Sequence, residues 1–230
     1  MPDSPTSSMR PTAQRRLSLV SSHLQERSST TSPPLARPRS RLAPSSSAFR
    51  YFLPFQSTWR DNDQYSHFNN VIYSQYFDSI TNEFLLNQCK MNSTTDPIGL
   101  IVHSETSFNQ QLSYPQPVLA ALSISTLSSR KIVWNLGLFD AEYTSSTSEN
   151  VPQGEYGRRI RIKRDKEGKE VRAAAWGTMT HVFVERHSEG RNKVVDELPE
   201  GWGEKLRGLV VSENEGGEGE GGKVGSGKGQ

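Results

Sequence analysis

The segment 59–78 reads WRDNDQYSHFNNVIYSQYFD and gathers residue types that can do chemistry. Its polar candidates are Asp61, Asp63, His67, Asn69 and Asn70. A carboxylate can act as a nucleophile or as a general base, and a histidine can position a substrate or a water. Asparagine side chains readily cap the start of a helix. The same carboxylates and amides also stabilise ordinary loops and turns, so composition alone leaves both interpretations open.

The residues that follow this cluster repeat at helical spacing. Large apolar side chains recur at three- and four-residue steps: Tyr73, Tyr76, Phe77, Ile80, Phe84 and Leu85. This stripe predicts a buried helix of roughly five turns, which begins at an N-cap on Asn69 or Asn70 and ends near Cys89. The acids and amides therefore precede the end of the helix where free N–H groups and the helix dipole favour negative charge.

Runs of β-branched and aromatic residues predict strands at 49–59, 98–108, 118–127, 131–139 and 171–186. Pro54 indicates that the first strand lies at an edge. A weakly apolar piece at 198–211 predicts a short helix packed on the sheet. The connections exclude repeated βαβ units, so we expect an α+β fold in which an antiparallel sheet of about five strands wraps around one long central helix.

The two ends of the chain differ from this core. Residues 1–48 are rich in Ser, Pro and Arg, and residues 212–230 are almost only Gly, Glu, Lys and Ser. Neither composition can bury enough apolar surface to offset the entropy of ordering, so we expect disordered tails around a domain at 49–211. Because residues 1–48 are poor in acids, they also resemble a mitochondrial transit peptide, which predicts a matrix protein. A generic tail on a cytoplasmic protein is the alternative.

Residues 143–170 form a polar insert with no core pattern, and we expect its second half to extend a hairpin into solvent. Its basic residues Arg158, Arg159 and Arg161 could contact phosphates, or they could form a solvated hairpin face among neighbouring acids.

Several classes of function find no support in the composition. The formal net charge of +2 gives no general case for nucleic-acid binding, and no apolar run is long enough to span a bilayer. Cys89 is the single cysteine, so no intramolecular disulfide can form. The scattered histidines and the single cysteine show no metal-ligand spacing, and we expect no metal.

The segment 59–78 resembles the start of the hotdog-fold acyl-CoA thioesterases of the 4-hydroxybenzoyl-CoA thioesterase type. Those proteins place D-x-D-x-x-G-H-V-N-N-x-x-Y-x-x-Y-F between a strand and a central helix. The matching residues are Asp61, Asp63, His67, Asn69, Asn70, Tyr73, Tyr76 and Phe77. Segments 98–118 and 176–186 resemble the second strand with its turn and the last strand. The insert departs from the family pattern, and Ser66 stands where the family has a glycine, which puts the conformation of this loop in doubt.

The resemblance implies a hydrolase that cleaves an acyl-CoA to a free acid and coenzyme A, with no cofactor other than the coenzyme A of its substrate. It assigns the role of base or nucleophile to Asp63, and it leaves Asp61 a structural residue. The N–H groups near Asn70 and Val71 would form the oxyanion site. His67 and Asn69 would position the substrate, and Tyr73 would line the acyl pocket. The family also implies a homodimer or homotetramer with sites at subunit interfaces.

Two other functions fit the same fold. A non-catalytic hotdog module could bind an acyl group or serve as a structural subunit. A hotdog hydratase would place Asp and His five residues apart in a D-x-N-P-x-H pattern, whereas Asp63 and His67 are four apart with no proline between them. The hydratase is therefore the weaker alternative.

Overall fold

The computed structural model describes residues 42–145, 159–186 and 193–211. The contacts between residues group the chain into two units with a boundary after Leu42. The fold described below belongs to the second unit, Ala43–Gln230. The predictions for residues 1–41 and 212–230, including the transit peptide, fall outside the described residues, and so do Arg158 and the middle of the insert.

The strands form one antiparallel sheet. Their bounds are β1 (Tyr51–Gln56), β2 (Ile98–Phe108), β3 (Pro117–Leu127), β4 (Lys131–Thr144), β5 (Arg159–Ile162) and β6 (Ala175–Val184). The strand order is β1-β3-β4-β6-β2, and β5 pairs with β4 outside this path. The five strands of this order confirm the five predicted strands. β1, which contains Pro54, lies at an edge of the sheet as expected.

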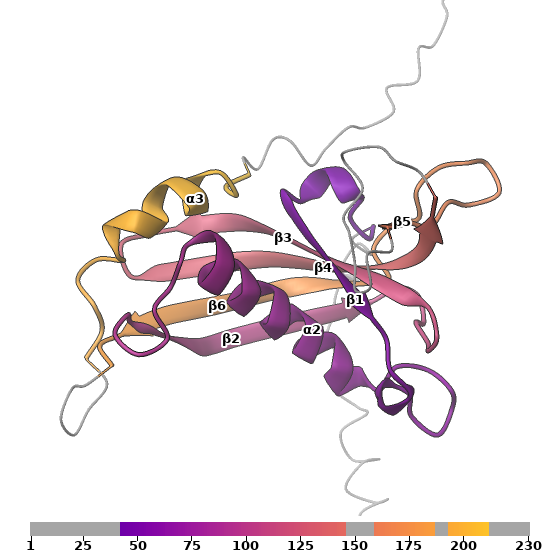
Figure 1. Ribbon diagram of the computed structural model, residues 1–230, viewed down its shortest axis with the longest axis horizontal. Helices are drawn as coiled ribbons and strands as arrows, with labels where there is room; N and C mark the ends of the chain where they lie inside the picture. The colour runs from indigo at the N-terminus through magenta and orange to yellow at the C-terminus, as the bar shows by residue number, and fades with distance from the viewer. Residues whose placement is uncertain (1–41, 146–158, 187–192, 212–230) are drawn as a thin grey trace, which may run out of the picture. The chain divides into compact units, whose positions relative to one another are not determined.

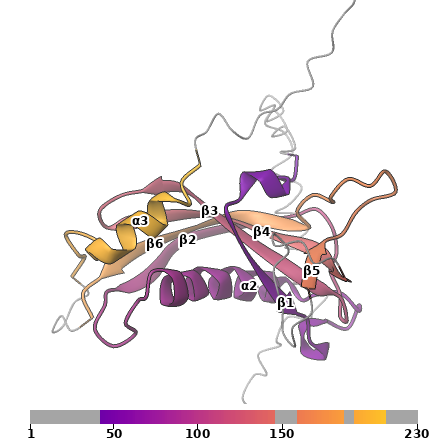
Figure 2. The ribbon, with the colours of Figure 1, turned by 45° about the horizontal axis from the view of Figure 1, so that its top comes forward.

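The long helix α2 (Asn70–Glu83) lies across one face of the sheet and continues into the π-helical segment η4 (Phe84–Gln88) (Figure 1, Figure 2). Every residue of the predicted apolar stripe is buried in the cluster between helix and sheet: Tyr73, Tyr76, Phe77, Ile80, Phe84 and Leu85. The alternating residues Ile132, Trp134 and Leu136 of β4 reach the same cluster. The helical spacing of the apolar residues therefore identified the central helix. The alternation of apolar residues in β4 identified the face of that strand that packs against the helix.

The opposite face of the sheet carries a second apolar cluster at one end. Phe49 and Ala173 pack there with Phe139 of β4, and Ile160 and Ile162 of β5 complete it. This cluster explains why burial alternates along the first half of β4 but becomes continuous after Leu136.

Two expectations are corrected by this second cluster. The domain begins before the predicted boundary at Phe49, because Ala43 is buried and Pro44 O accepts a hydrogen bond from Ala173 N at 3.0 Å. The insert does form a hairpin with β4, but it contributes Ile160 and Ile162 to the core. Their alternation with arginines concealed a two-residue core pattern inside a charged segment.

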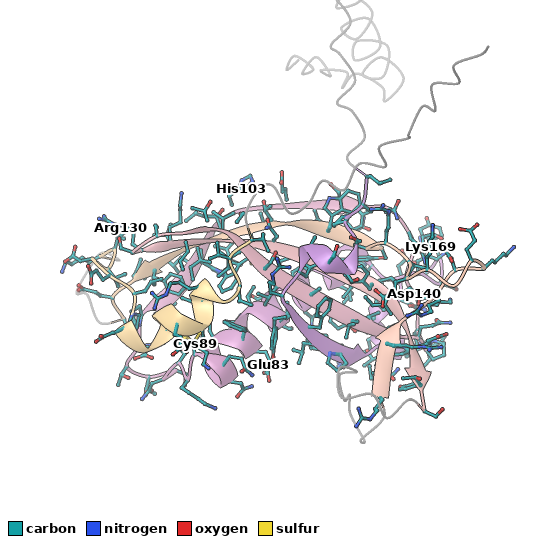
Figure 3. All side chains as sticks on the ribbon, turned by 90° about the horizontal axis from the view of Figure 1, so that it is seen from above. Glu83, Cys89, His103, Arg130, Asp140 and Lys169 are labelled. Carbon is teal, nitrogen blue, oxygen red and sulfur yellow. The ribbon has the colours of Figure 1, made fainter. Side chains whose placement is uncertain are left out.

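The C-terminal piece folds as predicted into the 3-10 turn η6 (Glu200–Trp202) and the short helix α3 (Gly203–Arg207). Trp202, Leu206 and Leu209 join the apolar cluster of α2. Figure 3 shows Cys89, at the end of the long helix, beside α3, while Asp140 lies toward the opposite end of the sheet. Among the described residues, no helix is long and apolar enough to cross a membrane.

Candidate active site

The loop before α2 is anchored by Asp61. Its carboxylate accepts hydrogen bonds from Thr58 N at 2.7 Å and Thr58 Oγ1 at 2.9 Å, which forms a capping box around residues 58–61. The Tyr76 hydroxyl donates to the same carboxylate at 2.8 Å. Burial, together with this bond to Asp61, raises the pKa of Tyr76. All of these partners are structural, which agrees with the role expected for Asp61.

Asp63 differs from Asp61 because only part of its carboxylate is engaged. Oδ1 accepts from Tyr65 N at 2.7 Å and, more weakly, from His67 N at 3.4 Å. Its backbone N donates to His67 O at 2.7 Å. No residue in the described part of the chain bonds Oδ2. One oxygen is therefore held by the loop, and the other is available for chemistry.

Ser66 occupies the position where the resembling family has glycine, and its φ is 65°. This is the left-handed region, which glycine enters freely and serine enters at a cost. Ser66 N donates to Asp63 O at 3.2 Å, which closes the turn between Asp63 and His67. The loop thus keeps the conformation that a glycine would favour, and serine carries the strain.

The start of α2 distinguishes the two predicted oxyanion donors. Asn69 is the N-cap, and its Oδ1 accepts from Val71 N at 3.2 Å. Its backbone O accepts from Ile72 N at 2.8 Å. The Asn70 N–H has no hydrogen-bond partner among the described residues. The two N–H groups therefore differ: that of Val71 is engaged by the cap, whereas that of Asn70 is free within the described residues.

A pocket of about 540 Å³ opens at this helix start. It brings together four of the predicted site residues: Asp63, His67, Asn70 and Tyr73. Its other lining residues were not predicted: Tyr65, Phe68, Phe108, Asn109, Gln110 and Gln111. Four of these residues form the run FNQQ at 108–111, which ends β2 at Phe108 and continues with three successive amide side chains.

One side of the pocket is aromatic. Tyr73 is buried, and its ring meets Phe108 edge-on with centroids 5.1 Å apart and Phe68 with centroids 5.9 Å apart. The Tyr73 hydroxyl accepts from Leu112 N at 3.2 Å. Burial, the larger effect, raises the pKa of Tyr73 despite this bond. Tyr73 is thus a neutral, fixed part of an aromatic wall of the pocket.

The other side of the pocket consists of amides on the loop after β2. The backbone N–H groups of Asn109 and Gln110 both donate to Ala174 O, at 2.8 and 3.0 Å. Asn109 Nδ2 lies 3.3 Å from Ala173 O, and Gln110 Nε2 lies 3.5 Å from Asp140 Oδ2. The segment before β6 and Asp140 of β4 therefore hold this loop in place.

Within the described part of the insert, neither Arg159 nor Arg161 lines this pocket. Arg161 forms an ion pair with Glu142 of β4, with Nη2 and Oε1 2.8 Å apart. Arg159 begins β5 on the same hairpin. The structure therefore does not bring Arg159 and Arg161 together with Asp63.

The strand histidines differ in environment. His103 is exposed on the edge strand β2 (Figure 3). His181 is buried, and its Nδ1 accepts from Trp134 Nε1 at 2.7 Å, so it is a satisfied core residue. Residues 42–145, 159–186 and 193–211 contain no group of three or more His, Cys, Asp or Glu that could hold a metal ion.

Comparisons with known proteins address the fold. No protein-family model matches the chain, and no curated protein matches it significantly. The structure is similar to that of the PA5185 protein from Pseudomonas aeruginosa strain PAO1, with a TM-score of 0.56 and 26% identity over 74% of this chain and 99% of that chain. It is also similar to a thioesterase superfamily protein from Jannaschia sp. CCS1, with a TM-score of 0.50 and 12% identity over 71% of this chain and 86% of that chain.

A further structural neighbour is a variant of 4-hydroxybenzoyl-CoA thioesterase in complex with 4-hydroxybenzoyl-CoA, with a TM-score of 0.49 and 14% identity over 67% of this chain and 96% of that chain. The sheet order and the long helix across one face agree with the fold expected from the resemblance. The described domain therefore has the hotdog fold, which it shares with the PA5185 protein and with the thioesterase superfamily protein from Jannaschia sp. CCS1.

Proposed function

We propose that this protein is a thioester hydrolase that cleaves an acyl-CoA into a free acid and coenzyme A. One observation carries the proposal: a carboxylate oxygen of Asp63 and the N–H of Asn70, neither bonded within the described residues, belong to residues that line the same pocket. Thioester hydrolysis needs these two elements, a nucleophile or base and a donor for the carbonyl oxygen.

In the proposed reaction, Asp63 either attacks the thioester carbonyl carbon or removes a proton from a water that attacks it. The N–H of Asn70, at the positive end of the α2 dipole, stabilises the negative charge that develops on the carbonyl oxygen. The bond between the acyl carbon and sulfur then breaks, and the thiolate of coenzyme A takes up a proton. If a water attacks, this step releases the free acid directly. If Asp63 attacks, the acyl group is left on its carboxylate as a mixed anhydride, and a water then hydrolyses that anhydride to release the free acid and restore the carboxylate. His67 lines the pocket and positions the substrate or the water, and Asn69 holds the helix start in place.

The acyl group would pack on the aromatic wall of Tyr73, Phe68 and Phe108. The reaction invokes no metal and no cofactor beyond the coenzyme A of the substrate. Arg161 would need to leave Glu142 before it could contact a phosphate of coenzyme A, so the structure does not favour that role for it.

The test is a screen of the purified full chain against short, long and aromatic acyl-CoAs, with free thiol as the readout. Asp63→Asn keeps the side-chain volume and removes the charge, so kcat should fall about 10²–10⁴-fold without loss of thermal stability. Asp78→Asn is the matched control, because Asp78 is exposed on α2 and does not line the pocket. Equal turnover by the wild type and Asp63→Asn would reject the assignment, and binding without any turnover would favour a non-catalytic acyl-binding module.

We also propose that two copies of the chain associate along β2. This strand ends the sheet, and it exposes Ile101 at 48%, Val102 at 61% and Phe108 at 50%. An edge with unpaired backbone groups and apolar side chains is suited to pairing with a second strand. Because Phe108 lines the pocket, a second copy would complete the site.

Light scattering should show a dimer or tetramer for the wild type and a shift toward monomer for Val102→Lys. The matching substitution Val71→Lys, on the exposed start of α2, should leave the mass unchanged. A monomeric wild type would refute the association. The mitochondrial location stays a separate proposal: a fluorescent fusion of residues 1–48 should enter mitochondria, and a diffuse cytosolic signal would reject it.

A further inference from the structure

The two walls of the pocket are chemically unlike. The α2 side presents aromatic rings, whereas the loop after β2 presents three successive amide side chains, Asn109, Gln110 and Gln111. An acyl-CoA has the same division on either side of its thioester, because the acyl group is apolar and the pantetheine arm carries secondary amides. An amide that enters a pocket must regain the hydrogen bonds it gave to water, or binding is weakened.

The orientation of the Gln110 amide is set by a charge behind it. Its Nε2 lies 3.5 Å from Oδ2 of Asp140 on β4, at the long limit of a hydrogen bond. The carboxylate attracts the NH₂ end of the amide and repels the carbonyl end. Because Gln110 lines the pocket, this orientation leaves its Oε1 as an acceptor for a ligand.

Asp140 is itself held by the insert. It is only 7% exposed, and a carboxylate in such a place needs a charged partner. Lys163, directly after β5, supplies one: its Nζ lies 3.0 Å from Asp140 Oδ2, and its backbone N donates to Asp140 O at 3.0 Å. The described part of the insert therefore places a cation behind the amide wall. Figure 1 and Figure 2 show β5 at the end of the sheet where α2 begins.

We propose that Gln110 is a substrate-positioning residue whose side-chain carbonyl accepts a hydrogen bond from an amide N–H of the pantetheine arm, and that the Asp140–Lys163 pair fixes its orientation. This inference rests on the proposed acyl-CoA substrate. It assigns the acyl group to the aromatic wall and the thiol side to the amide wall. It also gives the β5 hairpin a function in substrate binding.

The experiment compares each variant of the full chain on an acyl-CoA and on the same acyl group as an ethyl thioester, which lacks the pantetheine amides. Gln110→Met removes the acceptor at similar volume, so KM for the acyl-CoA should rise about fivefold to tenfold with little change in kcat. KM for the ethyl thioester should not change. Gln64→Met is the matched control, because Gln64 is exposed and does not line the pocket.

Lys163→Met should also raise KM for the acyl-CoA. The double variant of Gln110→Met and Lys163→Met should have a KM no higher than that of Gln110→Met alone, because both substitutions act through one contact. Lys169→Met on the same hairpin is its control. A KM that rises equally for both thioesters in Gln110→Met would overturn the inference, because a general distortion of the pocket would then explain it, and an unchanged KM for both would overturn it as well.

Direct titration with coenzyme A separates this inference from the proposed reaction. If no acyl-CoA is turned over but coenzyme A binds about fivefold to tenfold more weakly to Gln110→Met than to the wild type, the positioning role stands and the hydrolase proposal fails. If acyl-CoAs are turned over and Gln110→Met binds coenzyme A as the wild type does, the hydrolase proposal stands and the positioning role fails.

Discussion

Replacing Ser66 with glycine should stabilise the protein. Ser66 has a φ of 65°, and an L-residue in the left-handed region pays about 1–2 kcal/mol. Glycine avoids this cost but loses about 0.5–1 kcal/mol through the larger entropy of the unfolded chain. The difference predicts a gain of up to about 1.5 kcal/mol in the free energy of unfolding, which corresponds to a rise in Tm of up to about 6 °C for a domain of this size.

The same substitution at Ser74 is the matched control. Ser74 is exposed within α2, where the backbone is helical and glycine is the poorer residue. Ser74→Gly should therefore destabilise the protein by about 0.5 kcal/mol, so the two serine-to-glycine changes should have opposite signs. Urea unfolding of both variants at one pH measures the two changes.

A third variant separates the backbone from the side chain. Ser66→Ala keeps the left-handed cost and removes only the hydroxyl, so its stability should stay close to that of the wild type. Destabilisation of Ser66→Gly to the same extent as Ser74→Gly would refute the reasoning, because it would show that the 63–67 turn carries no strain.

Two further predictions follow from the core. Gly137→Ala should destabilise the protein by about 1–3 kcal/mol in urea unfolding, because its Cβ would lie 2.6 Å from the ring of Phe49; unchanged stability would show that Phe49 moves away without cost. Burial lowers the pKa of His181 from 6.5, so the unfolded chain binds a proton at this residue more readily than the folded chain does. The contribution of neutral His181 to the free energy of unfolding is therefore fully present above pH 6.5, and it is lost as the pH falls through the folded-state pKa. Stability measured from pH 8 to 5 should fall less steeply in His181→Gln, whose side-chain carbonyl can still accept from Trp134; parallel curves would contradict this.

The central helix and the main strands could be predicted from the sequence because periodicity reports directly which side chains share a face. The stripe from Tyr73 to Leu85 is buried against the sheet as its spacing required. The motif around Asp63 also indicated which carboxylate would lie free beside the helix start, although its catalytic role stays a prediction.

Other features depend on contacts that one segment alone does not indicate. Ile160 and Ile162 are buried because β4 and the segment around Phe49 happen to lie against them, whereas their neighbours in sequence are charged. The amide wall of the pocket depends on Ala174, which binds the backbone of Asn109 and Gln110 from far along the chain. Such contacts depend on two distant segments at once, so neither segment alone predicts them.

The sequence by itself determined the helix, the strands and the chemistry-bearing loop between them, because local spacing and local residue types decide these features. The tertiary structure alone decided which N–H of the helix start stays free, since the Asn69 side chain caps Val71 and leaves Asn70. It alone also decided that the insert holds Lys163 against Asp140 behind the pocket. Both outcomes are set by three-dimensional placement of single atoms, which residue identity and spacing do not specify.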